Sequence, residues 1–169
     1  SLQDLQYQIE KRIEKLKIIK HQELQLFLEN NIEPFWERIL SSSKTIWPVS
    51  LQKKKLPCSL RTFSPSDFGF HNSILNKEGK LIFIDLEYFG LDDPVKLMAD
   101  FLWHPAMDLK EENKKQWLKG TCYIFKKDTN LLNRFIAAWP MYGIRWILIL
   151  LNEFNKDFIK KRIEASLVK

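Results

Sequence analysis

A chain of 169 residues is long enough to bury one hydrophobic core and predicts a single domain. Hydrophobic residues make up 45% of it and aromatic residues 13%, which excludes intrinsic disorder, and only five glycines indicate a helix-rich fold. The net charge of +6 admits an anionic partner, but the 27 basic residues are mostly lysines spread along the chain, so we expect a solvated surface and no nucleic-acid partner.

Residues 2–29 predict one long helix, because apolar residues recur along it at steps of three or four. This apolar stripe is typical of a core-facing helix, and self-association through the helix as a coiled coil is the alternative. A short helix is predicted to restart by Pro34, which suits a first-turn position, and to fade near the serines at 41–43. Residues 44–66 contain three prolines and predict an irregular loop.

Two short apolar runs, at 73–75 and 81–84, flank the turn sequence Asn-Lys-Glu-Gly and predict a β-hairpin. No other part of the sequence predicts β-structure. After the hairpin, Asp93 as N-cap and Pro94 at the first position predict a helix through about Trp103. The fold class is therefore mainly α with one short β-hairpin.

The C-terminal third of the chain predicts helices near 110–126, 129–138, 141–154 and 156–168. Trp139-Pro140 separates the second of these from the third, because proline removes a helical hydrogen bond and clashes with the preceding turn. Arg145 falls inside an apolar helix, so we expect it to be buried with a carboxylate partner.

Cys58 and Cys122 lie far apart and have no Cys or His neighbour at zinc-ligand spacing. We expect two free, buried thiols. No secretory signal is visible, and the longest apolar run, around 147–151, is too short to span a bilayer, which needs about 20 residues. These observations predict a cytoplasmic protein with no membrane partner.

The segment from Ser64 to Asn72 and the hairpin after it carry the residues that most favour a function. Asp67 is followed five residues later by Asn72, and the hairpin ends in Ile84-Asp85-Leu86-Glu87. Phosphoryl transfer needs a divalent metal that neutralises nucleotide phosphates and a carboxylate that takes the proton of the attacking hydroxyl. Magnesium prefers the oxygen ligands that Asn and Asp supply. A loop followed by a hairpin can bring all three residues to one end of a short sheet.

This arrangement resembles the aminoglycoside phosphotransferase and choline kinase family, whose fold is protein-kinase-like. Its members carry a loop of the form H-x-D-x-x-x-x-N and then a hairpin ending in I-D-x-E or similar. Here the loop is Asp67-Phe68-Gly69-Phe70-His71-Asn72. The segment Phe89-Gly90-Leu91-Asp92-Asp93-Pro94 also resembles the family's G-x-x-D-P segment. The resemblance is sharpest from residue 63 to 105.

The resemblance implies the C-terminal lobe of such a kinase over residues 1–169, with the N-lobe absent from this chain. Residues 1–62 are then leading helices and a loop, 63–105 the catalytic loop, metal-binding hairpin and following helix, and 106–169 the C-terminal helices. The implied activity is ATP-dependent phosphorylation of a hydroxyl on a small molecule such as a sugar, an aminoglycoside or an amino alcohol. The implied cofactor is Mg²⁺, with ATP as phosphate donor.

By residue, the resemblance implies that Asp67 is the catalytic base, Asn72 and Asp85 are metal ligands, and Glu87 supports Asp85 or binds a second metal. The candidate substrate-binding residues are Asp92, Asp93, Asp100 and Trp103. Helix caps and structural hydrogen-bond acceptors are the alternative roles for the three aspartates. Tyr88, Trp103, Trp139, Tyr142 and Trp146 have two readings, a cation–π box or core aromatic residues.

Two features depart from the family pattern. Pro65 stands where the family has a histidine two residues before the catalytic Asp, and no glycine-rich phosphate loop precedes this region. The chain alone thus has half of an ATP site, and the isolated lobe is expected to be inactive. The alternative hypothesis is a degenerate kinase-like lobe that acts as a non-catalytic binding or assembly module. For His71 and His104, acid–base chemistry and structural hydrogen bonding are both open.

Overall fold

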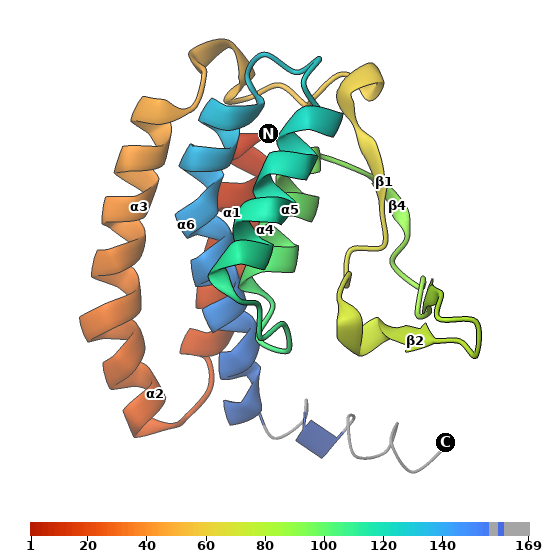
Figure 1. Ribbon diagram of the computed structural model, residues 1–169. Helices are drawn as coiled ribbons and strands as arrows, with labels where there is room; N and C mark the ends of the chain where they lie inside the picture. Colours follow the sequence, from red (N-terminus) through yellow and green to blue (C-terminus); the bar gives the residue numbers. More distant parts are fainter. Residues whose placement is uncertain (156–158, 161–169) are drawn as a thin grey trace.

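The computed structural model describes residues 1–155 and 159–160, and it confirms a mainly helical fold (Figure 1). The helix predicted at 156–168 lies outside the described residues, apart from 159 and 160. The main helices are α1 (Leu2–Lys17), α2 (Gln22–Phe27), α3 (Glu33–Ile46), α4 (Pro94–Trp103), α5 (Glu111–Ile124) and α6 (Leu131–Leu150). Short π or 3-10 turns lie at Leu28–Ile32, Val49–Leu51, Cys58–Leu60, Phe70–Asn72 and Leu151–Phe154.

The helix α6 lies at the centre of the helical part and packs against α1, α3 and α4 (Figure 1). Its Leu148 is fully buried, as are Ile9 of α1 and Met98 of α4. The apolar stripe of α1 therefore faces a core, as its periodicity predicts. Below, "helical core" means α1 to α6 with the turns between α1 and α3.

The prediction of one helix over 2–29 is wrong, because the chain turns back after α1. The carbonyls of Leu16 and Ile19 at the end of α1 accept hydrogen bonds from Gln25 Nε2, at 3.2 and 2.8 Å. His21 then caps α2, its Nδ1 accepting from the Leu24 amide. These polar contacts satisfy two helix ends inside one apolar repeat, so periodicity alone does not reveal the break.

The π turn at Leu28–Ile32 joins α2 directly to α3, so Pro34 continues a helix and does not start a separate one. In this turn the Glu33 amide donates to the carbonyl of Leu28, five residues back. The wider turn accommodates the proline, which has no amide hydrogen to donate. The helix then runs to Ile46, beyond the predicted end at the serines.

The predicted break at Trp139-Pro140 is also wrong, since α6 is continuous with Pro140 inside it. Neighbouring helices supply donors to two carbonyls in the turn that precedes the proline. Ser43 Oγ of α3 donates to the Ala137 carbonyl at 2.7 Å, and Trp103 Nε1 of α4 donates to the Trp139 carbonyl at 3.0 Å. Tertiary contacts therefore offset the local cost of proline, which is about 3 kcal/mol in a helix interior.

Residues Leu131–Phe154 form a stretch long and apolar enough to cross a membrane, judged by length and composition alone. The sequence prediction considered only the run around 147–151, which is shorter than this stretch, and the absence of a membrane partner stays a prediction. Half of the most apolar window is buried inside the fold, however, and the core helix of a soluble protein passes the same test. The stretch is weak evidence for a membrane span.

Two small antiparallel sheets lie beside the helical core (Figure 1). The predicted hairpin is confirmed as β2 (Ser73–Leu75) paired with β3 (Leu81–Phe83). The second sheet, β1 (Thr62–Ser64) with β4 (Gly90–Asp92), is a correction to the prediction of a single hairpin. Its strands are only three residues long and are separated by the whole hairpin, so no local turn sequence predicts their pairing. Below, "strand segment" means residues 62–92.

Two smaller predictions have clear outcomes. Helix α4 begins after Asp93, whose side chain accepts from the Val95 amide, and ends at His104, as predicted. Both cysteines are free, as expected, but Cys58 is exposed and Cys122 is half-buried. The expectation of buried thiols is therefore wrong, because Cys58 lies in the turn at Cys58–Leu60, away from the core.

Candidate active site

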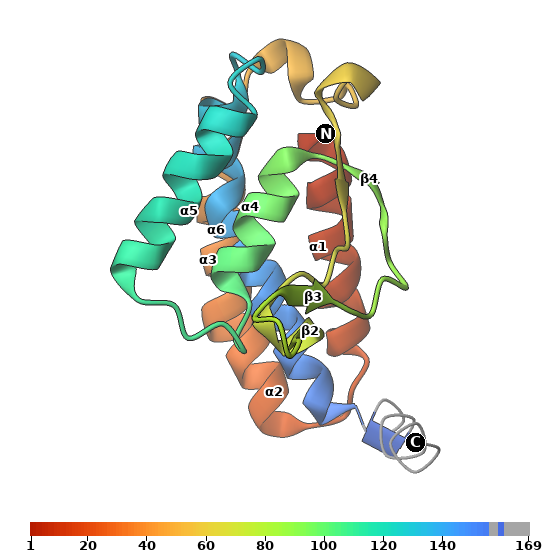
Figure 2. The same cartoon turned by 45° about the vertical axis from the view of Figure 1, so that its right-hand side comes forward.

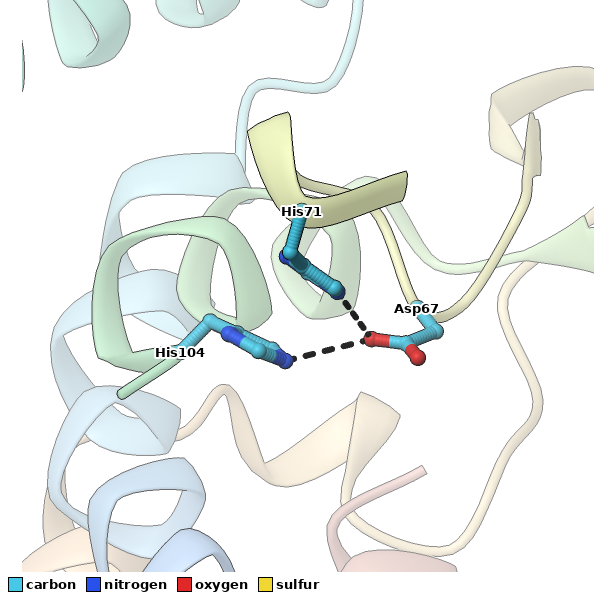
Figure 3. Close-up of side chains that lie close together, drawn as sticks. All are labelled: Asp67, His71 and His104. Carbon is cyan, nitrogen blue, oxygen red and sulfur yellow. Dashed lines mark hydrogen bonds and ion pairs between the residues drawn. The ribbon is translucent and has the colours of Figure 1, made fainter. Parts of the chain in front are cut away.

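Asp67 lies in the loop between β1 and the turn at Phe70–Asn72, and two histidines hold its carboxylate (Figure 3). Oxygen Oδ1 is 3.0 Å from His71 Nε2 and 3.2 Å from His104 Nε2. The two rings stack, with centroids 4.0 Å apart and planes inclined by 12°. His71 belongs to the same loop, whereas His104 follows α4. The pair therefore fastens the loop to the helical core.

The hydrogen bond at the other nitrogen of His104 fixes the role of this ring. The Ala106 amide donates to Nδ1 at 3.1 Å, so a neutral His104 carries its proton on Nε2 and donates it to Asp67. Histidines that bind metals almost always donate from their second ring nitrogen, which here accepts. Although the ligand atoms of Asp67, His71 and His104 lie within 4.8 Å of one another, this bond favours a hydrogen-bonded carboxylate over a transition-metal site.

The surroundings of His104 favour its neutral form. Burial lowers the pKa of His104, and the nearby charge of His71 lowers it further, while Asp67 acts in the opposite direction. The edge of the Trp146 ring packs against His104, with centroids 4.5 Å apart. A neutral His104 orients the carboxylate of Asp67 without cancelling its charge.

The second carboxylate oxygen of Asp67 is free to act on another molecule. Within the described part of the chain no donor contacts Oδ2, and this oxygen points away from both histidines (Figure 3). The Asp67 side chain is 44% exposed. One oxygen is thus fixed by the protein, and the other is accessible from outside.

Two strained backbone positions mark the same region. Among the described residues, the non-glycine residues with positive φ are Ser66, at 64°, and Asp85, at 58°. Such conformations are costly for residues with a side chain and are enriched at functional sites. Ser66 directly precedes Asp67 and is held by two bonds: its amide donates to Ser64 Oγ, and its Oγ accepts from Lys96 Nζ at 3.1 Å.

Asn72 joins the loop to the end of the hairpin. Its Nδ2 donates to the Asp67 carbonyl at 3.1 Å, which leaves the side-chain oxygen Oδ1 available as a ligand atom. Its carbonyl accepts from the Ile84 amide at 2.9 Å, so Asp85 follows a residue bonded directly to Asn72. Asp85 and Glu87 are exposed, and their carboxylates bond to none of the described residues.

The three aspartates proposed as substrate-binding residues already have partners. Asp92 pairs with Lys96 at 3.2 Å, and Asp93 caps α4 and pairs with Arg134. Asp100 pairs with Arg145 at 2.5 Å and with Lys96 at 3.2 Å. The buried Arg145 with a carboxylate partner is as predicted. These contacts are the cap and acceptor roles given as the alternative, and a substrate role for the aspartates stays a prediction.

The aromatic residues considered for a cation–π box take part in several separate contacts. Trp103 stacks on Trp139, with centroids 4.6 Å apart, whereas Trp146 contacts His104. Tyr142 is buried under the guanidinium of Arg145. Tyr88 lies on the exposed strand segment. Among these residues, Trp103 is the candidate for substrate binding, and it lies over α6, where it donates to a backbone carbonyl.

Two residues of the site were not singled out from the sequence. Lys96 links the strained Ser66 to Asp92 and Asp100, and its spacing of four residues from Asp100 on α4 is a readable signal. Gly69 lies so close to His71 that an added Cβ would come within 2.6 Å of the imidazole ring. Only glycine permits this approach, and the sequence carries no sign of it.

No protein-family model, curated protein or solved structure matches this chain. The interpretation of the site therefore depends on the geometry of its own residues.

Proposed function

We propose that this chain is the C-terminal lobe of an ATP-dependent small-molecule phosphotransferase, a cytoplasmic kinase in which Asp67 is the catalytic base. The observation that carries the proposal is the Asp67 carboxylate, with Oδ1 held by two histidines and Oδ2 open to another molecule. General-base catalysis requires a carboxylate that is already oriented toward the hydroxyl when the acceptor binds. The strained backbone on either side of the site supports the same reading.

The chemistry assigned to Asp67 is the removal of a proton. Oδ2 accepts the hydrogen of the acceptor hydroxyl, while His71 and His104 keep the carboxylate plane fixed through Oδ1. His104 donates as a neutral ring, so Asp67 retains the negative charge that attracts the proton. General-base catalysis of this kind contributes roughly 10²–10⁴-fold to a rate.

The residues that would hold magnesium in this proposal are Asn72, Asp85 and Glu87. Asn72 offers its amide oxygen, and Asp85 and Glu87 offer carboxylates that bond to no other described residue. These are hard oxygen ligands, which Mg²⁺ requires. Bound with ATP, the ion would neutralise the charge of the nucleotide phosphates. The remaining nucleotide contacts would come from a second lobe, so we expect the lobe alone to be inactive.

The test is transfer of the labelled γ-phosphate of ATP to a mixture of cellular small molecules by the full-length protein. Asp67→Asn should lower the rate by at least about 10²-fold, because the amide cannot accept the proton. Asp108→Asn is the matched control, since Asp108 is exposed and bonds to no described residue. Transfer by Asp67→Asn at the native rate would show that Asp67 is not the base.

A second candidate function is a non-catalytic binding or assembly module built from a degenerate kinase-like lobe. The apolar side chains exposed along the strand segment favour it, because contiguous exposed apolar surface marks interaction sites. A folded full-length protein that neither transfers phosphate nor binds Mg²⁺–ATP would support this function over the first.

A further inference from the structure

An apolar groove of about 480 Å³ runs between the loop of Asp67, α4 and α5. Figure 2 shows α5 beside α4, with the β2–β3 hairpin close to the lower end of α4. The groove is lined chiefly by Phe70, Phe101, Leu109, Trp117 and Ile124. Its volume lies in the range of small-molecule sites, about 300–1,000 Å³.

Among the residues that the structure describes, the lining of the groove contains no charged side chain, although 28% of the residues of the chain are charged. Its polar members include the side-chain amides of Asn113 and Gln116 on α5. Aromatic walls with a few neutral hydrogen-bonding groups suit a flat, uncharged molecule. A cation or an anion bound there would lose its hydration water and would find no opposite charge among these residues.

The groove borders the part of the chain that carries Asp67, because Phe70 lines it. Phe68, the residue after Asp67, packs against two groove residues, with ring centroids 5.5 Å from Phe101 and 5.9 Å from Trp117. Phe70 lies in the same loop and meets Phe101 edge-on at 6.1 Å. A molecule in the groove therefore lies against the walls that support the catalytic loop.

The cavity beside Asp92 and Asp93 also favours an uncharged acceptor. This cavity, of about 300 Å³, is separate from the groove and is also bordered by Lys96 and Arg61, so both signs of charge are present there. The carboxylates of Asp92 and Asp93 are each already paired with a cation of the protein. A polycationic acceptor would have to displace these partners, whereas a neutral one need not.

We infer that the groove binds the flat, uncharged part of an acceptor alcohol, and that aminoglycosides are not the acceptors. That the bound alcohol is phosphorylated rests on the proposed function. The acceptor oxygen forms a bond to the γ-phosphorus of ATP as the bond from that phosphorus to the β–γ bridging oxygen breaks. ADP leaves, and the hydroxyl proton goes to Oδ2 of Asp67.

The test uses 2-naphthol, a neutral aromatic alcohol, as the binding probe, with equilibrium dialysis against the full-length protein. Gly120 lines the groove, and a Cβ added there would meet no atom within 4 Å. Gly120→Leu should therefore fill the groove and weaken binding at least tenfold. The helix should not suffer, because leucine is a better helix former than glycine. Lys119→Leu adds the same side chain one residue away, at an exposed position outside the lining, and should bind like the native chain.

Two results would overturn the inference: failure of 2-naphthol to bind the native protein, or equal binding by the native and Gly120→Leu proteins. Kanamycin, a polycation, serves as the competing acceptor class, and tighter binding of kanamycin than of 2-naphthol would also overturn it. None of these measurements involves phosphate transfer. They therefore separate failure of the groove from failure of Asp67 as a base, which the Asp67→Asn rate decides.

Discussion

The helical core and the strand segment differ in where they place their apolar side chains. In the helical core, Ile9 and Leu148 are fully buried. In the strand segment, Ile74 and Ile82 face each other across the hairpin, and both remain about half exposed. Isolated two-stranded sheets are marginal in water. The helical core is thus stabilised by its own packing, whereas the strand segment depends on its attachments to that core.

The candidate site lies where the two regions meet. His104 after α4 contacts Asp67, Lys96 of α4 contacts Ser66, and Phe101 of α4 packs on Phe68. A stable helix therefore fixes one wall of the site, and a weakly supported loop forms the other. In the proposed function, a second lobe would supply the rest of this site.

The largest expected effect is the loss of a buried cation of the helical core. Arg134 is 1% exposed and pairs with both Asp93 and Asp128. Arg134→Met keeps the length of the side chain but leaves two carboxylates without their partner, so unfolding free energy should fall by about 3–5 kcal/mol. Urea denaturation measures this loss. Lys17→Met, which breaks the exposed pair with Glu33, should cost less than about 1 kcal/mol. A similar cost for both would mean that burial does not set the value of these pairs.

The second prediction compares one residue type in the two regions. Ile9 is 0% exposed and Ile82 is 48% exposed. Ile9→Ala should cost about 2–5 kcal/mol of unfolding free energy, because it leaves a cavity in the core. Ile82→Ala should change the same quantity by less than about 0.5 kcal/mol. A large cost at Ile82, in urea denaturation of the same protein, would show that the strand segment is buried against another part of the molecule in solution.

In both regions, short-range features could be predicted from the sequence, and features made by contacts between distant residues could not. Local signals predicted α4, the hairpin and the core face of α1, because caps, turn residues and apolar periodicity are short-range features. They failed at Pro140, where donors from Ser43 and Trp103 support the helix. They also failed at the β1–β4 pairing, where the partners are far apart in sequence.

The contacts that join Asp67 to Asn72, and Asn72 to the residue before Asp85, are local and follow from the loop and hairpin, whereas the roles of these residues stay a prediction. The contribution of His104 could not be predicted from the sequence, because α4 and the strand segment must pack before its ring meets Asp67. The apolar groove is equally a product of packing, as its walls come from three separate segments.

The third prediction concerns Gly69, in the loop that carries Asp67. An added Cβ would come within 2.6 Å of the His71 ring and 2.9 Å of Met107 Sδ. Gly69→Ala should cost about 1–3 kcal/mol in unfolding free energy, because these groups must shift. It should also slow phosphate transfer, since His71 would lose its contact with Asp67. Gly90→Ala is the control, as nothing lies within 4 Å of its added Cβ. Equal stability and equal phosphate-transfer rates for both variants would mean that the loop can accommodate a methyl group at residue 69.

The smallest effect is a pH dependence that reports on the contact between the regions. The pKa of His104 is lowered from its usual 6.5, chiefly by burial and then by the charge of His71. Between the folded pKa and 6.5 the unfolded chain binds more protons, so unfolding free energy should fall as the pH drops below about 6.5. His104→Gln should flatten this slope, which denaturation at a series of pH values measures.

Asp67→Asn should have the opposite effect on the same slope. Asp67 raises the pKa of His104 against the effect of burial, so removing its charge should lower that pKa further. The unfolded chain then binds more protons than the folded one over a wider pH range, and acidification should destabilise this variant more than the native protein. Flattening by one substitution and steepening by the other would establish that the carboxylate and the ring are coupled in solution. Parallel slopes in all three proteins would mean that the strand segment does not hold Asp67 against His104.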